Sequence, residues 1–544
     1  MHYKGFYLNL DGSAFEEALL SEIYVDKTEL IAVTNSVLRT KNKYMCVSRP
    51  RRFGKTMTLE MLEAYYTKGI NAAELFKHTK IYKNNDFYKY ANKYNVLHLN
   101  MANFANKSVD DMIANLNHEL LNDFREEYPE AKLYPDDSIA KLIAKIYKLS
   151  KMYFIVIIDE WDIIFRKSGI QNNENAQERY LYFLREWLKD NRYIALVYMT
   201  GILPIKKYGE HSALNMFTQY SMEDQQELTE FTGFTTEDVK KLCAKYHRSY
   251  DTCKMWYDGY RLGYYVNDEN GIDNPVKYDI YNPLAVVSAM RTGSFVNYWS
   301  KTENYEALQK YIMINADNLK DIIIELIAGN RHKVDTSSFQ NDMYTFNSAN
   351  DILTLLIHLG YLAYDFETQE VFIPNKEIQA EFITSIKNSD GWKNVTDAIQ
   401  KSDGLLNAIW CEDSETVGRL MEEAHLETSH LQYNDENALS YTISLALYSA
   451  RKYYTIIREM PAGKGFADLI FIPNKNNLDK PALLVELKWD KTAQTAINQI
   501  KNKQYAKELS NFAGNIMLVG ITYNKDIDKE KRTHACIIEK ITTI

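Results

Sequence analysis

Apolar runs alternate with helical stretches along the first 225 residues of the chain. The helical stretches include segments 55–66 and 178–190. Parallel strands are buried on both faces, so each appears in a sequence as a continuous apolar run. Four such runs read as strands: Tyr44–Ser48, Asn95–Asn100, Tyr153–Asp159 and Tyr193–Thr200. This order predicts a parallel α/β sheet domain over residues 1–225.

The pattern turns mostly helical over residues 226–400. Thr235 is placed to cap a helix that runs through Leu242. Further on, Ile352–Leu359, a turn at Gly360 and Val371–Ile373 predict a helix, a turn and a short strand, as in a winged-helix unit. Such units bind DNA in some proteins and act as spacers in others. No basic residues gather here, so we favour a spacer.

A regular order of helices and strands returns in a third domain, residues 401–544. A helix, three strands, a second helix and a fourth strand follow one another. We expect them at Glu436–Ala450, Tyr453–Glu459, Phe466–Ile472, Ala482–Trp489, Thr492–Leu509 and Asn515–Thr522. The fold class is therefore α/β, with one sheet domain at each end of the chain.

Composition narrows the class of protein. The chain has 544 residues, 46% of them apolar and 25% charged, which is the balance of a soluble globular protein with about three domains. The longest apolar runs are too short to span a membrane, and the N-terminus carries no targeting pattern, so we expect a cytoplasmic protein without a membrane partner. The net charge is −9, yet residues 451–544 hold 16 Lys and Arg against 10 Asp and Glu. This local excess of +6 leaves room for a phosphate-containing partner.

A phosphate-binding loop is encoded between the first strand and the first long helix. The string RPRRFGKT, Arg49 to Thr56, matches the second half of the motif GxxxxGK[ST], with Arg49 where the first glycine stands. Gly54 lets backbone N–H groups approach the phosphates, and Lys55 reaches the β and γ oxygens. Thr56 is placed to hold Mg²⁺ at the helix N-terminus.

Two further elements support a nucleotide site. The strand at 153–158 ends in Asp159 and Glu160, the form of a Walker B strand. Asp159 would hold Mg²⁺, and Glu160 would orient or deprotonate the attacking water. Thr200 ends the next strand, where a sensor residue would touch the γ-phosphate or the water. Arg51 and Arg52 either add positive charge toward the phosphates or face solvent. A strand ending in a charged turn is common by itself, but the two motifs in this order predict that the chain binds ATP.

A second constellation lies near the C-terminus. Asp468 stands eighteen residues before the triplet Glu486-Leu487-Lys488, which is the core of a PD-(D/E)XK pattern. The first and third side chains of the triplet share one face of a strand, and a hairpin can bring Asp468 beside Glu486. Two carboxylates supply hard oxygen ligands for Mg²⁺ or Mn²⁺. Lys488 would position a water and stabilise the developing negative charge.

Two neighbouring helices add to this constellation. Glu436, on the helix before the strands, could complete the metal shell. Gln499 and Lys503 lie four residues apart on the following helix, so both can face the same site. The alternative is a set of ordinary solvated pairs on an exposed strand face.

These motifs together resemble the AAA-ATPase-like proteins of bacteria and archaea that are usually fused to a PD-(D/E)XK nuclease-like domain. The resemblance rests on residues 24–28 (YVDKT), the string RPRRFGKT, Asp159-Glu160 and Thr200-Gly201, and extends to Tyr257-Asp258-Gly259-Tyr260 and Leu359-Gly360-Tyr361-Leu362. It covers almost the whole chain. It implies an AAA-like P-loop domain, a restriction-endonuclease-like C-terminal domain, and a Gln and Lys on the helix at 492–509, with Tyr505 after them. In that family the loop itself starts with Arg-Pro-Arg, as it does here.

Two functions follow. The first is ATP-regulated, metal-dependent hydrolysis of DNA, in defence or in the processing of mobile elements, with ATP and Mg²⁺ (or Mn²⁺ at the nuclease site) as cofactors. The second is a nucleotide-switched scaffold whose nuclease fold is weak or inactive and only binds nucleic acid. An RNA substrate would be cleaved by the same chemistry and remains an alternative to DNA. The sequence is also compatible with a homo-oligomer.

Overall fold

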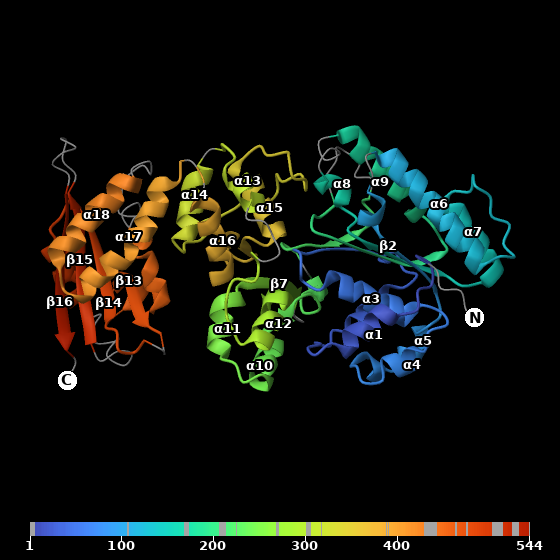
Figure 1. Ribbon diagram of the computed structural model, residues 1–544, viewed down its shortest axis with the longest axis horizontal. Coiled ribbons are helices and arrows are strands. Elements are labelled where there is room, and N and C mark those ends of the chain that lie inside the picture. The colour runs from blue at the N-terminus through green and yellow to red at the C-terminus, as the bar shows by residue number, and fades with distance from the viewer. Residues whose placement is uncertain are drawn as a thin grey trace. The chain divides into compact units, whose positions relative to one another are not determined.

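The structure is a computed structural model (Figure 1). It describes residues 6–105, 108–167, 173–205, 214–224, 226–267, 271, 273–300, 306–316, 318–387, 389, 391–428, 443–462, 465–474, 477–502, 515–524 and 533–542, and only the backbone at 394, 425–428, 458–462 and 465–468. The chain forms two compact units. Unit 1 comprises Met1–Asn304 and His332–Ala380, and unit 2 comprises Tyr305–Arg331 and Glu381–Ile544. The three-domain boundaries expected from the sequence stay predictions.

Unit 1 is built on a parallel sheet with the strand order β2-β3-β4-β1-β5. Its strands are β1 (Tyr44–Ser48), β2 (Asn95–Asn100), β3 (Phe154–Asp159), β4 (Ile194–Gly201) and β5 (Thr218–Tyr220). The four strands expected from apolar runs are confirmed to within one residue. The short strand β5 pairs with β1 and was not expected, because three residues are too few to give a pattern.

Helices cover both faces of this sheet, which explains the fully apolar strands. In Figure 1, α6, α7 and α9 lie together on one side of β2, and α1, α3, α4 and α5 lie on the other. The helix α9 begins at Glu174, one turn earlier than expected, because the side chain of Asn173 accepts a hydrogen bond from the Ala176 N–H and caps it. The helices of this region are α1 (Ser13–Leu20), α2 (Leu30–Val37), α3 (Lys55–Tyr66), α4 (Ala72–Leu75), α5 (Phe87–Tyr90), α6 (Val109–Glu127), α7 (Ile139–Ser150), α8 (Ile163–Arg166) and α9 (Glu174–Leu188).

The following part of unit 1 contains more sheet than the sequence indicated. Thr235 and Asp238 form a capping box at the start of α10, as the pattern predicted. After α11, however, the chain forms an antiparallel hairpin, which joins β6 in a sheet of order β6-β8-β7. The elements are β6 (Phe234–Thr235), α10 (Thr236–Lys245), α11 (Tyr250–Tyr257), β7 (Tyr260–Asn267), β8 (Asp273–Tyr281) and α12 (Pro283–Thr292). The aromatic string at 256–260 is thus the join between α11 and β7.

A helix followed by a small antiparallel sheet completes unit 1. The helix α15 (Ala349–Leu359) ends at Gly360, and β10 (Ala363–Asp365) and β11 (Glu370–Phe372) follow it and pair with β9 (His332–Lys333). This is the helix, turn and strand arrangement expected of a winged-helix-like unit. The helix α16 (Lys376–Lys387) continues the chain into unit 2.

Unit 2 is built on a mixed five-stranded sheet of order β12-β13-β14-β15-β16, in which only β14 and β15 run parallel. The expected strands are confirmed, and β16 adds a fifth. Helical residues 443–446 and the turn η4 (Tyr448–Lys452) occupy the end of the expected helix at 436–450, whose first part lies outside the described residues. The elements are α13 (Glu306–Ile312), α14 (Leu319–Ile327), α17 (Lys393–Trp410), α18 (Ser414–Thr428), β12 (Tyr454–Ala462), β13 (Gly465–Pro473), β14 (Ala482–Trp489), α20 (Ala493–Asn502), β15 (Asn515–Asn524) and β16 (Thr533–Thr542).

No helix within the described ranges is both long enough and apolar enough to cross a membrane.

Candidate functional site

The loop between β1 and α3 takes the shape that its sequence predicts. Gly54 precedes the first residue of α3 with φ of 83°, a left-handed conformation that glycine adopts without strain. Arg52 also has a positive φ, of 68°. The N-terminal turn of α3 is therefore open toward the loop, where its unpaired N–H groups favour an anion.

Arg49, which replaces the first glycine of the motif, has a structural role in this loop. Its side chain is fully buried and donates hydrogen bonds to Thr232 Oγ1 (2.9 Å) and to the carbonyls of Ser48 (2.8 Å) and Tyr220 (3.0 Å). Burial lowers the pKa of this guanidinium to about 9. The arginine thus fastens the start of the loop to β5 and to the segment before β6.

Lys55 is held by its own loop. Its Nζ donates hydrogen bonds to the carbonyl oxygens of Arg49 (2.9 Å) and Pro50 (2.8 Å). Burial lowers the pKa of this ammonium to about 8, and the carboxylate of Asp159 opposes that shift. Two carbonyls are weaker partners for a cation than phosphate oxygens, so the ammonium is available for exchange onto a phosphate.

Asp159 is the centre of the site. It is the last residue of β3 and is buried, and its Oδ2 accepts a hydrogen bond from Thr56 Oγ1 (2.9 Å). Its Oδ1 accepts one from Thr200 Oγ1 (2.6 Å). The three side chains come from α3, β3 and β4, and parallel pairing sets the ends of β3 and β4 next to each other. The structure therefore brings Thr56, Asp159 and Thr200 together, as the sequence predicted.

Glu160 follows Asp159 but turns toward a different partner. Its φ is 50°, and its carboxylate pairs with Arg166 Nη2 at 3.1 Å. Arg166 also pairs through Nε with Asp162 (3.1 Å), which in turn accepts the N–H groups of Ile202 and Leu203. The Glu160 carboxylate is thus tied to the last turn of α8 through Arg166, a partner that the sequence did not indicate.

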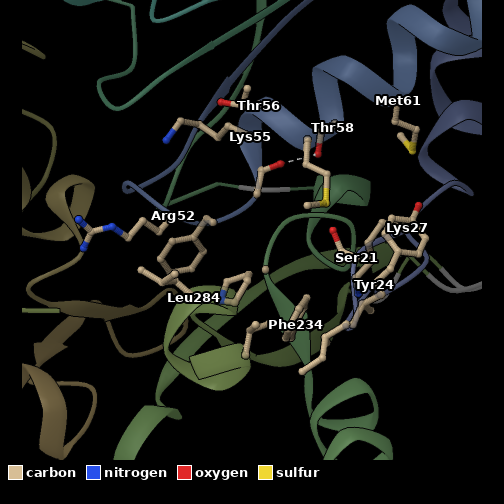
Figure 2. A pocket seen from close by; sticks show the side chains of 18 of the residues that line it. Ser21, Tyr24, Lys27, Arg52, Lys55, Thr56, Thr58, Met61, Phe234 and Leu284 are labelled. Atoms are coloured by element: carbon tan, nitrogen blue, oxygen red, sulfur yellow. Dashed lines mark hydrogen bonds between the residues drawn. The ribbon is translucent and has the colours of Figure 1, made fainter. Parts of the chain in front are cut away.

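A cavity of about 810 Å³ opens beside this cluster, a size typical of small-molecule sites. One end is lined by the loop residues Arg51 to Thr56 with Asp159 and Glu160. Figure 2 shows Lys55 and Thr56 at the start of α3, with Tyr24, Phe234 and Leu284 at the other end. The apolar end was not predicted, although Tyr24 belongs to a string already noted in the sequence. Its walls include residues from three separate segments, which lie within 23–25, 231–234 and 283–287.

The second predicted site lies in unit 2, on β14. Glu486 is fully buried, and its Oε1 accepts hydrogen bonds from Lys488 Nζ (3.1 Å) and from Gln499 Nε2. The predicted Glu, Lys and Gln are therefore brought together from β14 and α20. Glu436, Lys503 and Tyr505 lie outside the described residues.

The strands β13 and β14 that carry Asp468 and Glu486 are neighbours in the sheet. Leu469 pairs with Val485 in the antiparallel ladder between β13 and β14. Asp468 and Glu486 are the next residues along the two strands, and the side chain of Asp468 lies outside the described part of the chain, so its place beside Glu486 stays a prediction. Among the side chains that the structure describes, no group of three or more His, Cys, Asp or Glu residues gathers as a metal site.

Gly520 sets the distance between α20 and the sheet. It pairs with Glu486 in the parallel ladder of β14 and β15. A Cβ atom at this position would lie 2.7 Å from the carbonyl oxygen of Ala493 and 3.0 Å from Ile497. The absence of a side chain therefore allows α20 to approach closely enough for Gln499 to reach Glu486, a feature that no sequence pattern indicated.

Family comparisons identify both regions. Residues 14–209 match the family model described as a predicted AAA-ATPase, and residues 436–533 match the PD-(D/E)XK nuclease superfamily. An AAA-ATPase-like match is thus followed along the chain by a match to the PD-(D/E)XK nuclease superfamily, in the order that the resemblance implied. No curated protein matches it.

Several solved structures share low similarity with the chain. A Walker-type ATPase of Pyrococcus abyssi is 12% identical over 65% of this chain and 94% of its own, with a TM-score of 0.32. Cdc6p of Pyrobaculum aerophilum is 12% identical over 70% of this chain and 99% of its own (TM-score 0.24). The ORC2 protein of Aeropyrum pernix, in ADPNP and ADP complexes, is 11% identical over 70% and 98% (TM-score 0.27).

Proposed function

We propose that unit 1 binds and hydrolyses ATP with Mg²⁺ in the cavity beside β1 and β3. The observation that carries this proposal is the convergence of Thr56 and Thr200 on the two oxygens of Asp159. A hydroxyl and a buried carboxylate at a helix N-terminus are the hard oxygen donors that Mg²⁺ prefers, so the residues present fit the ion.

Each residue of the loop has one task in this proposal. Lys55 exchanges its two loop carbonyls for the β and γ oxygens, and Gly54 admits the phosphates to the backbone N–H groups. Thr56 and Asp159 hold the metal. When bound, Mg²⁺ neutralises charge on the phosphate oxygens. Arg51 and Arg52 line the cavity and add positive charge beside the phosphates.

Glu160 receives the proton of the attacking water in this scheme. The carboxylate is tied to Arg166 in the conformation described here. Hydrolysis therefore requires Glu160 to turn from Arg166 toward the water, while Asp162 keeps Arg166 in place. Thr200 contacts the carboxylate of Asp159, the residue that precedes Glu160. We therefore expect the Thr200 side chain to respond when Glu160 turns toward the water.

We propose in the same way that unit 2 cleaves phosphodiester bonds of DNA. Asp468 and Glu486, with Glu436, would hold Mg²⁺ or Mn²⁺. Such an ion would lower the pKa of a water molecule bound to it. Lys488 then stabilises negative charge as it develops on the phosphate, and Gln499 fixes the orientation of the Glu486 carboxylate. ATP binding in unit 1 would regulate this cleavage, in defence or in the processing of mobile elements.

One observation favours the alternative, a nucleotide-switched scaffold with an inactive nuclease fold. Lys488 and Gln499 both donate to the same oxygen of Glu486, which is fully buried. A carboxylate that is already paired with a cation loses that attraction when it turns to a metal ion. In this alternative the pair is a structural feature of the sheet, and unit 2 binds nucleic acid without cleaving it.

The test compares the parent protein with Glu160→Gln. ATP hydrolysis is measured as phosphate release, and cleavage as the relaxation of plasmid DNA with Mg²⁺ or Mn²⁺, each with and without ATP. The proposal predicts that the variant binds ATP normally but hydrolyses it at least about a hundredfold more slowly, because the general base is lost. Hydrolysis at the parent rate would contradict the role of Glu160. Absence of cleavage under all conditions would favour the scaffold.

A further inference from the structure

The edge of the unit 1 sheet opposite the phosphate loop carries a concentration of positive charge. The loops that lead into β1, β2, β3 and β4 (residues 38–43, 91–94, 147–153 and 189–193) contain eight Lys and Arg residues and one carboxylate, Asp190. The chain as a whole carries −9, so this charge of +7 is strongly local. The nucleotide cavity lies at the carboxyl ends of the strands, and these loops lie at their amino ends.

Six of these cations are exposed: Arg39, Lys41, Lys93, Lys148, Lys151 and Arg192. Within the described part of the chain, none of the six forms an ion pair with a carboxylate. The two remaining cations are engaged in the fold: Lys43 donates to the carbonyls of Asn191 and Ile194, and Lys189 to the side chain of Asn215. We call the six exposed cations the basic edge.

The strand register keeps the basic edge compact. Asn95 pairs with Phe154, and Phe154 pairs with Ile194, so β2, β3 and β4 begin side by side. The strand β1 pairs with β4 from Tyr44 onward. At about 4.8 Å between neighbouring strands, four strand starts span only about 15 Å. Charges so close repel one another, and an anionic ligand would relieve that repulsion.

Helix dipoles explain only part of this charge. The helices α2, α7 and α9 end at this edge, and cations stabilise helix C-termini. Each C-terminus is equivalent to about half a negative charge, so three of them offset about 1.5 charges. The remaining positive charge is several times larger, and among the residues that the structure describes no ion pair of the six exposed cations offsets it.

Tyrosine rings lie between these cations. The rings of Tyr147 and Tyr153 have centroids 4.9 Å apart, and those of Tyr147 and Tyr193 have centroids 4.6 Å apart. The guanidinium of Arg39 lies over the Tyr153 ring at 4.2 Å. All three rings are half-buried, so each keeps a rigid position and an accessible part. Cations interleaved with fixed aromatic rings are the features with which proteins bind single-stranded nucleic acid.

We propose that the basic edge is a binding surface for single-stranded nucleic acid, separate from both the ATP cavity and the site on β14. The cations contact backbone phosphates, and the cluster of Tyr147, Tyr153 and Tyr193 supports unpaired bases. The proposal does not depend on hydrolysis at either site.

The test uses the full chain in EDTA, which prevents metal-dependent cleavage. Binding of a fluorescein-labelled thymidine 20-mer is followed by fluorescence anisotropy for the parent, for Arg39→Gln/Lys148→Gln/Lys151→Gln, and for a control with the same charge change. The control is Lys240→Gln/Lys241→Gln/Lys245→Gln, three exposed lysines on α10. We expect the first variant to bind at least tenfold more weakly and the control to stay within twofold. The slope of log K against log salt should fall by about 2, at about 0.7 for each lost phosphate contact.

A second variant tests the aromatic part. Tyr147→Leu keeps apolar volume but removes the ring, so we expect about fivefold weaker binding of the single strand and no change for a duplex of equal length. Equal affinity of the parent for duplex and single strand would overturn the single-strand assignment. Unchanged binding by the triple variant would overturn the proposal. The proposal would also be overturned if the triple variant lost binding to phosphatidylserine vesicles but not to the single strand. That result would assign the basic edge to a membrane surface.

Discussion

Thr200 on β4 donates a hydrogen bond of 2.6 Å to Asp159 on the neighbouring strand β3. Thr56 at the start of α3 donates to the other oxygen of the same carboxylate. The carboxylate is therefore fixed at both oxygens by residues from two other elements. Asp159 thus has one defined orientation in the wall of the cavity, which is the preorganisation that a metal-nucleotide site requires.

Replacing Lys55 by Ala should remove most of the affinity for ATP. The Lys55 ammonium is held by two carbonyls of the loop whose N–H groups would bind the phosphates, and Arg51 and Arg52 also line the cavity. Losing a charge-assisted contact to phosphate costs about 1.5–3 kcal/mol, so affinity should fall by about ten- to a hundredfold. A titration with a fluorescent ATP analogue measures this. The exposed Lys245→Ala is the control, and equal binding by both variants would contradict the assignment of the loop.

ATP affinity should fall as the pH rises above 8. Burial lowers the pKa of Lys55 to about 8 in the free protein, so the ammonium is charged below this pH and increasingly neutral above it. Bound phosphate favours the charged form, and affinity is therefore highest below pH 8 and declines from pH 8 toward 10. The measurement is the dissociation constant of ATP between pH 6.5 and 9.5. In Lys55→Arg this decline should begin at a higher pH, because a guanidinium starts from a much higher pKa than an ammonium. A flat profile in the parent would contradict the prediction.

Gly520→Ala should disrupt the contact between Gln499 and Glu486 without changing either residue. The new Cβ would lie 2.7 Å from the Ala493 carbonyl, so α20 must move outward and carry Gln499 away from Glu486. Overpacking of this kind lowers the free energy of unfolding by about 1–3 kcal/mol. The matched control is Gly404→Ala on α17, where a Cβ meets nothing within 4 Å, and alanine should stabilise that helix by up to about 1 kcal/mol. Thermal melts and cleavage assays compare the two variants. Equal stability would contradict the prediction, because it would show that α20 accommodates the added methyl group.

Glu486→Gln and Lys488→Met should separate the two roles on β14. The first removes a metal ligand while keeping the shape of the side chain, so metal binding and cleavage should both be lost. The second removes the charge that stabilises the reacting phosphate, so cleavage should fall by about a hundredfold or more while metal binding persists. Calorimetric titration with Mn²⁺ and plasmid cleavage provide the two readings. Cleavage by Glu486→Gln at the parent rate would contradict the nuclease assignment.

Much of the fold could be predicted because short sequence segments identify the strands that later pair across the sheet. The strands β1 to β4 are buried on both faces, and their apolar runs leave little ambiguity. The hairpin of β7 and β8 was missed because its burial is uneven, with its outer residues exposed and no alternating pattern to read. The strand β16 was missed for a related reason, since it pairs at the sheet edge with residues nine or more positions away.

In the two sites, the residues that belong to sequence motifs were predicted. The residues that reach the sites only through tertiary contacts were not. Thr56, Asp159 and Thr200 were expected from their places at strand and helix ends, and they meet. The pairing of Arg166 with Glu160 depends on a side-chain rotation that no spacing encodes. The apolar end of the cavity is assembled from segments more than 200 residues apart, so only the folded chain reveals it.

The central claim, that Asp159 holds the metal of a bound nucleotide, is tested most directly by Asp159→Asn. Asparagine keeps one carbonyl oxygen that accepts from one of the two threonine hydroxyls, places an NH₂ group where the other hydroxyl can accept, and removes the negative charge. The measurement is the affinity for ATP, by calorimetry, in Mg²⁺ and in EDTA. We predict that the parent binds at least tenfold more tightly in Mg²⁺ than in EDTA, and that the variant binds equally weakly in both. Binding of Mg²⁺ and ATP by the variant at the parent affinity would contradict the account.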